Sequence, residues 1–287
     1  NHNTFAFSKA ILTLHNYNLT GSSVLIEELK SLVKENADVI PYSESNTSGT
    51  EGFKRDVACI VRPITLGVIQ ELIKFAGSVV NTPNQFSLYP ISSGKNWGYG
   101  SSMPSTVEEK VVLLDLCALN DITYFDEENG VISIQPGVTQ SALFEYLSSK
   151  QTSYMVPVTG AGPTTSILSN ALERGYGITP IADHFSSVMS IKGFLADGSF
   201  YQSSLQCMSD MANGDNSECY VDKTFKWKHG PYLDGIFTQS GNMIVTEITL
   251  SLARVKPAFD SFYMRFFDKE SFNNAYAVVK EIFHNLE

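Results

Sequence analysis

The sequence predicts an α+β fold, in which helices and strands are mixed, rather than a doubly wound parallel sheet. Strand-like and helix-like segments alternate in the first part of the chain, whereas hairpin signals dominate later. Asn129-Gly130 and Asp197-Gly198 each separate two apolar runs, and both pairs tolerate the positive φ angles of tight turns. Two antiparallel hairpins are therefore expected in the later part of the fold.

Helices are indicated by apolar residues that recur every three to four positions. The first helix follows Ser22 or Ser23, either of which can cap it, and the second is expected to be capped by Thr65. Gly175 is expected to end the helix at 167–174. The segments concerned are residues 22–34, 65–76, 140–149 and 167–174.

Strands are indicated by short runs rich in Val, Ile and aromatic residues. The run at 111–116 is almost wholly apolar, which is typical of a strand covered on both faces. Residues 41–56 are polar and contain Ser and Gly, so a loop is expected there. The predicted strands are residues 57–61, 86–91, 111–116, 122–125, 131–134, 190–195, 199–202 and 243–252.

The composition excludes several classes of protein. Acidic residues outnumber basic ones by 30 to 20 in this chain of 287 residues, which argues against a nucleic-acid partner but not against an anionic cofactor. No apolar run approaches the roughly 18 residues of a membrane span, and no HxxH or HExxH spacing predicts a metal site. Cys59 and Cys117 lie in apolar runs and are expected to be buried free thiols. The first residues do not resemble a signal peptide, so a cytoplasmic location is expected; glycosylation sequons at Asn18 and Asn46 leave a periplasmic or secreted one open.

The most informative segment is the glycine-rich stretch that follows the predicted strand at 86–91. Its glycines let the backbone turn sharply, so that successive N–H groups can point into one concavity that suits a diphosphate. It is not a P-loop, since Tyr89 stands where the first Gly is required, and it lacks the Rossmann GxGxxG spacing. A purely structural turn is the alternative interpretation. The stretch contains Gly94, Gly98 and Gly100, and its candidate donors are Ser92, Ser93, Lys95 and Asn96.

Four segments, in order, resemble the vanillyl-alcohol oxidase and p-cresol methylhydroxylase family of FAD-linked oxidoreductases. Residues 92–100 are similar to the family's diphosphate loop, Ser-x-Gly-Arg-Asn-x-Gly-Tyr-Gly, with Lys95 in place of the Arg. Lysine keeps the charge but loses the forked donors of Arg. The other segments are 135–139, 170–184 and 230–246; they resemble Glu-Pro-Gly-Val-Thr, then Asn-x-x-Glu-Arg-Gly-x-Gly-Tyr-Thr-Pro with Asp-His, then Gly-Pro-x-x-Asp-Gly-Leu-Phe-x-Gln-Ser with Ile-Val-Thr.

The resemblance implies a two-subdomain FAD-binding fold, with FAD extended between two α/β subdomains. It implies an N-terminal helical segment at 1–50, an FAD-binding domain at 51–255, and the beginning of a truncated cap domain at 256–287. In the diphosphate loop, the cofactor-binding residues that it implies are Ile91, Ser92, Ser93, Gly94, Lys95, Asn96, Tyr99 and Gly100. Elsewhere they are Pro157, Val158, Thr159, Ser166, Asn170, Gly175, Tyr176, Gly177, Ile244 and Val245.

The activity that the resemblance implies is that of an oxidase or dehydrogenase, which moves a hydride from an alcohol-type or phenolic small molecule to FAD. Oxygen or an electron-acceptor protein would reoxidise the flavin, and a homodimer is left open. The catalytic residues are expected beyond Glu287. Val158 stands where close relatives carry an acidic residue, which weakens the transfer of a p-cresol or vanillyl alcohol substrate. A flavin-fold reductase and a degenerate nucleotide-binding protein without chemistry are the alternatives.

Two further pairs of charged or titratable residues have open roles. Asp183 and His184 form either a proton relay or a hydrogen-bonded structural pair that fixes a loop, and the second role is favoured. Glu173 and Arg174 either touch the cofactor or form an ion pair at a helix end.

Overall fold

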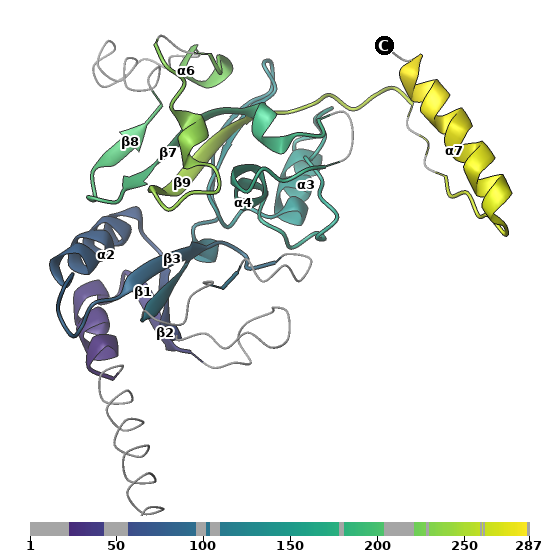
Figure 1. Ribbon diagram of the computed structural model, residues 1–287. Helices are drawn as coiled ribbons and strands as arrows, with labels where there is room; N and C mark the ends of the chain where they lie inside the picture. Colours follow the sequence, from purple (N-terminus) through teal and green to yellow (C-terminus); the bar gives the residue numbers. More distant parts are fainter. Residues whose placement is uncertain are drawn as a thin grey trace, which may run out of the picture. The chain divides into compact units, whose positions relative to one another are not determined.

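The computed structural model describes residues 23–42, 57–95, 102–103, 110–177, 181–203, 221–227, 230–258, 260 and 262–285 (Figure 1). The chain divides into two compact units, residues 1–254 and residues 255–287. The first unit contains two sheets, each with its own helices, and the second contains one long helix. The mixture of helices with one partly parallel and one antiparallel sheet confirms the predicted α+β fold.

The first sheet has the strand order β1-β2-β4-β3. β1 runs antiparallel to β2, whereas β2 and β3 both run parallel to β4. A helix at residues 23–33 precedes β1, and α2 connects β2 to β3 (Figure 1). The elements are β1 (Ala37–Pro41), β2 (Val57–Pro63), α2 (Leu66–Ser78), β3 (Ser87–Ile91) and β4 (Val111–Asp115).

Both faces of the first sheet are covered, as the apolar run at 111–116 predicts. Val112 and Leu114 of β4 pack into a core with the helix at 23–33 and α2, while Val111 and Leu113 face a smaller cluster on the other side. Thr65 occupies the N-cap position of α2, but its side chain makes no capping hydrogen bond. The predicted helix is therefore confirmed, whereas the capping role given to Thr65 is wrong, because apolar packing of α2 on the sheet fixes this helix.

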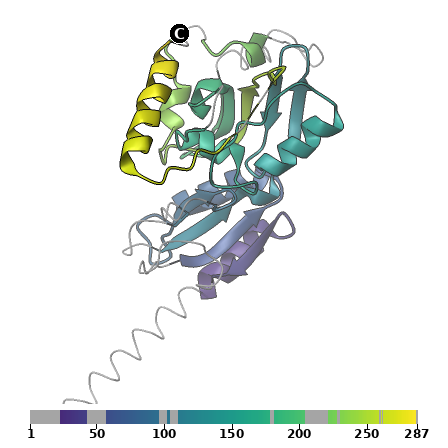
Figure 2. The same ribbon diagram turned by 90° about the vertical axis from the view of Figure 1, so that its right-hand side faces the viewer.

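The second sheet is antiparallel throughout, with the order β5-β6-β9-β7-β8. Both predicted hairpins are present, β5–β6 and β7–β8, and their turn glycines have positive φ angles of 65° at Gly130 and 81° at Gly198. The helices α3 and α4 pack on one face of this sheet around a second apolar core (Figures 1 and 2). The elements are β5 (Ile122–Asp126), β6 (Val131–Ile134), α3 (Gln140–Ser149), α4 (Ile167–Leu172), β7 (Val188–Leu195), β8 (Phe200–Gln202) and β9 (Met243–Ser251).

Short helical turns connect these elements. The 3-10 turns are η2 (Leu116–Ala118), η3 (His184–Ser187) and η5 (Asp234–Phe237), and α6 (Val221–Thr224) is a single helical turn. η2 follows β4 directly, and the Asp115 side chain caps it by accepting from the Cys117 N–H at 3.0 Å. The same carboxylate pairs with Arg62 at 2.8 Å, so it ties the end of β4 to β2.

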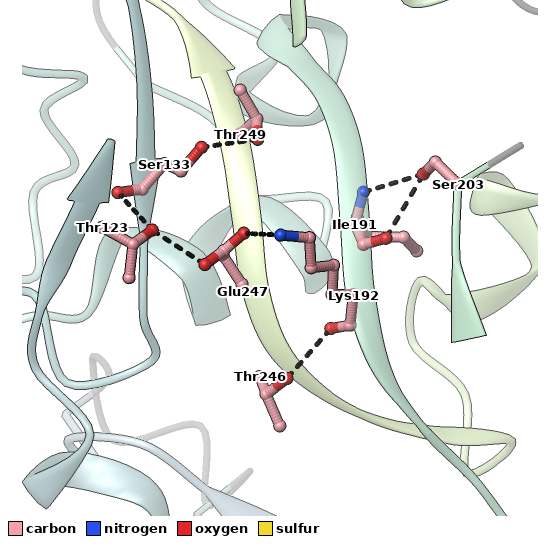
Figure 3. A network of polar contacts seen from close by, with 8 residues as sticks. All are labelled: Thr123, Ser133, Ile191, Lys192, Ser203, Thr246, Glu247 and Thr249. Atoms are coloured by element: carbon pink, nitrogen blue, oxygen red, sulfur yellow. Dashed lines mark hydrogen bonds and ion pairs between the residues drawn. The ribbon is translucent and has the colours of Figure 1, made fainter. Parts of the chain in front are cut away.

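The other face of the second sheet carries a polar network (Figure 3). The Glu247 carboxylate accepts a hydrogen bond from Thr123 Oγ1 at 2.7 Å and pairs with Lys192 Nζ at 2.9 Å. The Ser133 and Thr249 hydroxyls are 2.8 Å apart between β6 and β9. These contacts connect β5, β6, β7 and β9 across one surface. The buried Ser190 hydroxyl, on the residue of β7 that pairs with Thr249, has no hydrogen-bond partner among the described residues.

A bulge in β9 joins the two cores. The register between β7 and β9 shifts at Gly193, so no residue of β7 lies opposite Thr246 in the ladder, and the Thr246 hydroxyl donates to the Lys192 carbonyl at 3.4 Å. Just before the bulge, two successive residues of β9 face opposite sides: Ile244 packs into the core of the first sheet, and Val245 into that of the second. A further link comes from the β7–β8 turn, where Gln70 of α2 donates to the Gly198 carbonyl at 2.7 Å.

Residues 255–287 form the second compact unit. Its helix α7 (Lys269–His284) begins at Asp268, whose carboxylate accepts from the Ser271 N–H at 2.7 Å. No residue of α7 is buried. No helix in the described part of the chain has the length and apolar character needed to cross a membrane.

Candidate cofactor-binding site

The predicted diphosphate loop begins at the carboxyl end of β3, beside the parallel strand β4. Open sheets with parallel strands bind ligands at this end. Ser92 is buried, and Gly94 has a φ of +62°, a conformation in which side chains are strained. Lys95 is exposed. Asn96, Tyr99 and Gly100 lie outside the described residues.

Ser166 connects this loop to the second sheet's helices. Its backbone N–H donates to Ser93 Oγ at 3.2 Å, and its own hydroxyl donates to the Pro136 carbonyl at 2.6 Å. The same hydroxyl caps α4 by accepting from the Ser169 N–H at 3.2 Å. Ser166 is fully buried, so each of these groups depends on its protein partner. The structure thus brings two of the predicted site residues, Ser93 and Ser166, into direct contact.

Gln140, the first residue of α3, holds the segment that contains Pro157, Val158 and Thr159. Its side-chain oxygen accepts from the Thr159 N–H at 3.0 Å, and its side-chain nitrogen donates to the Gly162 carbonyl at 2.7 Å. Sequence reasoning missed this residue, because a polar side chain at the start of an amphipathic helix gives no sign of being buried. Val158 is 44% exposed, so this segment presents an apolar side chain to the surroundings.

The segment after α4 is shaped by close packing. α4 ends at Leu172, so the prediction that the helix continues to residue 174 and stops at Gly175 is wrong. Arg174, and not Gly175, has the left-handed φ, at +53°. Gly175 instead packs closely against Asn170. A Cβ on Gly175 would lie 2.5 Å from the Asn170 carbonyl oxygen. Tyr176 is 79% exposed and pairs with Asp183 through an isolated β-bridge.

His184 lies beneath this segment and is 3% exposed. Its Nδ1 hydrogen-bonds to Asn170 Oδ1, and its backbone N–H donates to the Gly175 carbonyl at 3.3 Å. Burial lowers the pKa of His184, and the nearby Asp183 opposes this shift. Asp183 itself caps η3 by accepting from the Ser186 N–H at 3.2 Å. The two side chains therefore fix a loop, as favoured above, but each bonds to a different partner.

Glu173 and Arg174 do not form the helix-end ion pair considered above, for no such pair joins them in the described chain. Arg174 Nε donates to Thr238 Oγ1 at 3.0 Å, which ties the end of α4 to the segment after η5. Burial raises the pKa of Glu173. Its backbone carbonyl accepts from Gln239 Nε2 at 3.0 Å, a second link between the same two segments.

Ile244 and Val245 are buried in β9 and pair on one side with β7. β6 pairs only with residues 248–251, so the described residues contain no strand on the other side of Ile244 and Val245. Main-chain N–H and C=O groups in such a place require partners. This edge can therefore hydrogen-bond to a ligand through the backbone, without a polar side chain.

These features fit a flavin dinucleotide. A glycine turn with two serines stands at a strand end, a strand edge offers backbone groups, and the buried Thr165 hydroxyl next to Ser166 has no hydrogen-bond partner. Hydroxyl and backbone donors of this kind suit phosphates and the polar edges of aromatic rings. Across the described ranges, no group of three or more His, Cys, Asp or Glu side chains could hold a metal ion.

The two cysteines in the described residues are free thiols, as predicted. Cys59 is buried, and burial raises its pKa to about 12. The prediction that Cys117 is also buried is wrong, because this residue of η2 is only partly covered. The pKa of Cys117 is raised to about 11, mainly by desolvation and then by its hydrogen bond to Asp115. Neither thiol is a thiolate at neutral pH, which argues against either as a nucleophile.

Comparisons with known proteins agree with this geometry. Residues 57–204 match the family model described as FAD binding domain. The chain is 32% identical over 195 residues to 1'-carboxy-chondrochloren decarboxylase from Chondromyces crocatus, covering 68% of this chain and 34% of that protein. It is 27% identical over 239 residues to the 4-cresol dehydrogenase [hydroxylating] flavoprotein subunit from Pseudomonas putida, covering 83% of this chain and 43% of that protein. The chain thus spans between a third and a half of the length of these relatives.

Solved structures with a similar fold support the same assignment. The fold matches p-cresol methylhydroxylase with substrate bound at a TM-score of 0.72 and 24% identity, covering 83% of this chain and 44% of that one. It matches 4-ethylphenol oxidase from Gulosibacter chungangensis at a TM-score of 0.69 and 23% identity, with the same coverage of 83% and 44%. At these identities the likeness concerns the fold.

Proposed function

Because the chain belongs to the FAD binding domain family, and within it to the vanillyl-alcohol oxidase and p-cresol methylhydroxylase type, we propose that the whole protein is an FAD-dependent oxidoreductase acting on an alcohol-type or phenolic small molecule. The observation that supports this proposal is the contact between Ser93 and Ser166, because it joins the proposed diphosphate loop to the helix of the second subdomain. An extended dinucleotide would bridge the same two subdomains.

When bound, FAD supplies a ring that accepts a hydride from a C–H next to oxygen or benzylic to a phenol. The chain's own residues bind and orient the cofactor. The loop at 91–100 is proposed to hold the diphosphate through backbone N–H groups, with Lys95 adding charge. The edge of β9 at Ile244 and Val245 is proposed to hold a ring through main-chain groups. The flavin is proposed to lie along Pro157, Val158, Thr159, Ser166, Asn170, Gly175, Tyr176 and Gly177.

Val158 bears on the proposed chemistry. An exposed apolar side chain at this position cannot accept or donate a proton, whereas an acidic residue could. Proton transfer from the substrate is therefore proposed to depend on residues beyond Glu287. Residues 256–287 are proposed to begin the cap domain that would cover the substrate.

The test is spectroscopic. The natural full-length protein should be yellow as purified or after addition of FAD, with two visible absorbance bands. A panel of phenols and benzylic alcohols should then bleach these bands under anaerobic conditions. A full-length protein that is colourless and unaffected by added FAD would contradict the proposal and favour a degenerate nucleotide-binding protein.

The electron acceptor is tested on the same protein. The relative from Pseudomonas putida is called a dehydrogenase subunit, and the structural neighbour from Gulosibacter chungangensis is called an oxidase. We therefore propose either an electron-acceptor protein or oxygen as the acceptor. Oxygen consumption during turnover identifies an oxidase; turnover only with an artificial electron acceptor identifies a dehydrogenase.

A second candidate function is supported by the 32% identical relative, which is called a decarboxylase. Loss of a carboxyl group from a substrate bound at the same cofactor domain is the alternative. Carboxylated phenols in the substrate panel separate the two functions, since the decarboxylase releases carbon dioxide and the simple oxidoreductase does not.

A further inference from the structure

We propose that His184 is a positioning residue that fixes the flavin-side wall of the cofactor site. The inference rests on the proposed function and deepens it, because the role that the sequence favours for Asp183 and His184 is only the fixing of a loop. Three chain segments proposed to line the flavin meet at His184: residues 157–159, the end of α4, and residues 175–177.

His184 contacts two of these segments directly and lies close to the third. Its Nδ1 hydrogen-bonds to Asn170 Oδ1 on α4, and its backbone N–H donates to the Gly175 carbonyl at 3.3 Å. Its Nε2 lies directly against Gly177, in the space that a Cβ on Gly177 would need. The Val158 carbonyl oxygen lies 2.7 Å from that Cβ position. The imidazole thus packs against α4 and residues 175–177, and the Val158 carbonyl lies next to Gly177. A displacement of the ring would displace the first two segments and disturb the third.

The hydrogen bonds also define the form of the ring. Because Asn170 Oδ1 is an acceptor, His184 Nδ1 carries the proton and Nε2 is left with a lone pair. Nε2 is buried and has no hydrogen-bond partner. A second proton there would place a charge against Gly177 without an acceptor, and burial accordingly lowers the pKa of His184. The wall is therefore supported by a neutral imidazole.

The bond between His184 and Asn170 determines how the Asn170 amide is turned. With Oδ1 directed to His184, the Asn170 Nδ2 atom lies against Gly175, where a Cβ would overlap it. Gly175 and Gly177 can then follow the path observed, since neither has a side chain. Loss of the donor at His184 would free the Asn170 amide and let residues 175–177 shift, even in a variant that keeps the volume of the ring.

The experiment uses the natural full-length holoenzyme and three single variants. His184→Phe keeps a ring but removes the donor, and His184→Gln keeps a donor. Ser186→Ala, on the same 3-10 turn and exposed, is the matched control. We expect His184→Phe to weaken FAD binding roughly tenfold and to change the fine structure of the visible bands. His184→Gln should restore binding to within about threefold, and Ser186→Ala should behave as the wild type.

A double variant distinguishes positioning from simple packing. If His184 acts through Asn170, then Asn170→Ala with His184→Phe should bind FAD no more weakly than Asn170→Ala alone. Additive losses would overturn the inference. So would a His184→Phe protein with the wild-type dissociation constant and spectrum. If His184→Phe does not fold, the comparison of His184→Gln with His184→Ala carries the same test, and equal loss of FAD in both overturns it. A wild type that binds no FAD refutes the proposed function instead.

Discussion

Replacing Gly193 by alanine should destabilise the second sheet and disturb the edge of β9 proposed to hold the cofactor. Gly193 lies on β7 opposite the bulge of β9. A Cβ there would lie 2.9 Å from the Val245 Cα and closer still to the Ile244 carbonyl oxygen. Both are main-chain atoms, so no side-chain rotation relieves the overlap. β9 itself must move away from β7.

The size of the effect follows from this geometry. Forcing extra atoms into a packed interior costs about 1–3 kcal/mol. Weakened ladder hydrogen bonds next to the bulge add about 1 kcal/mol. We expect Gly193→Ala to lower the free energy of unfolding by about 2–4 kcal/mol. The matched control is Gly77→Ala in α2, where no atom lies within 4 Å of the new Cβ. Because alanine is the better helix former, this control should gain about 0.5–1 kcal/mol.

Urea unfolding followed by far-UV circular dichroism measures both free energies. FAD titration followed by flavin fluorescence then tests the edge of β9. FAD should bind less tightly to Gly193→Ala than to the wild type, and equally tightly to Gly77→Ala. If Gly193→Ala unfolds within about 0.5 kcal/mol of the wild type, the close approach of β7 to β9 is refuted.

Four other changes have expected outcomes. Ser93→Ala removes the acceptor of the buried Ser166 N–H, so urea unfolding should show a loss of about 1–2 kcal/mol; an unchanged midpoint would contradict the contact between loop and α4. Glu247→Gln breaks a partly buried ion pair whose side chains are 31% and 15% exposed, and should cost about 1–2 kcal/mol at both low and high salt; a loss that vanishes in salt would show a solvated pair. Cys59, with its raised pKa and complete burial, should not react with a thiol reagent until the protein is unfolded, which mass spectrometry of the labelled chain can check. His184 has a lowered folded pKa, so the unfolded chain takes up a proton that the folded one resists, and stability should fall as the pH drops below about 6.5; His184→Gln should flatten this dependence in urea midpoints measured between pH 5.5 and 7.5, and an equal slope in both proteins would argue against a neutral buried ring.

Local features of the fold could be predicted from the sequence where one short segment decides the structure. Asn129-Gly130 forms the expected hairpin turn because its glycine tolerates a φ of +65°. The run at 111–116 forms the expected strand, which ends at Asp115, because its Val and Leu side chains are buried on both faces of the sheet. The strand preceding the diphosphate loop was likewise predictable, since its apolar residues and the following glycines are neighbours in the sequence.

The features that depend on distant residues could not be predicted. No local signal shows that β9 bulges at Thr246, because the bulge is set by Gly193 on another strand. Gln140 and His184 gain their roles only from partners 19 and 14 residues away, which the helix and turn patterns do not specify. Arg174 rather than Gly175 adopts the left-handed conformation, since packing against Asn170 overrides the usual preference for glycine.

The strand order of the second sheet imposes an order of assembly on the nascent chain. β9 is the last of its five strands to leave the ribosome, yet it lies between β6 and β7. Until residue 251 has been made, the β5–β6 and β7–β8 hairpins each present an open edge that no part of the sheet can cover. Such edges pair readily with other chains. Cellular production is therefore most vulnerable to aggregation in the interval between synthesis of β8 and synthesis of β9.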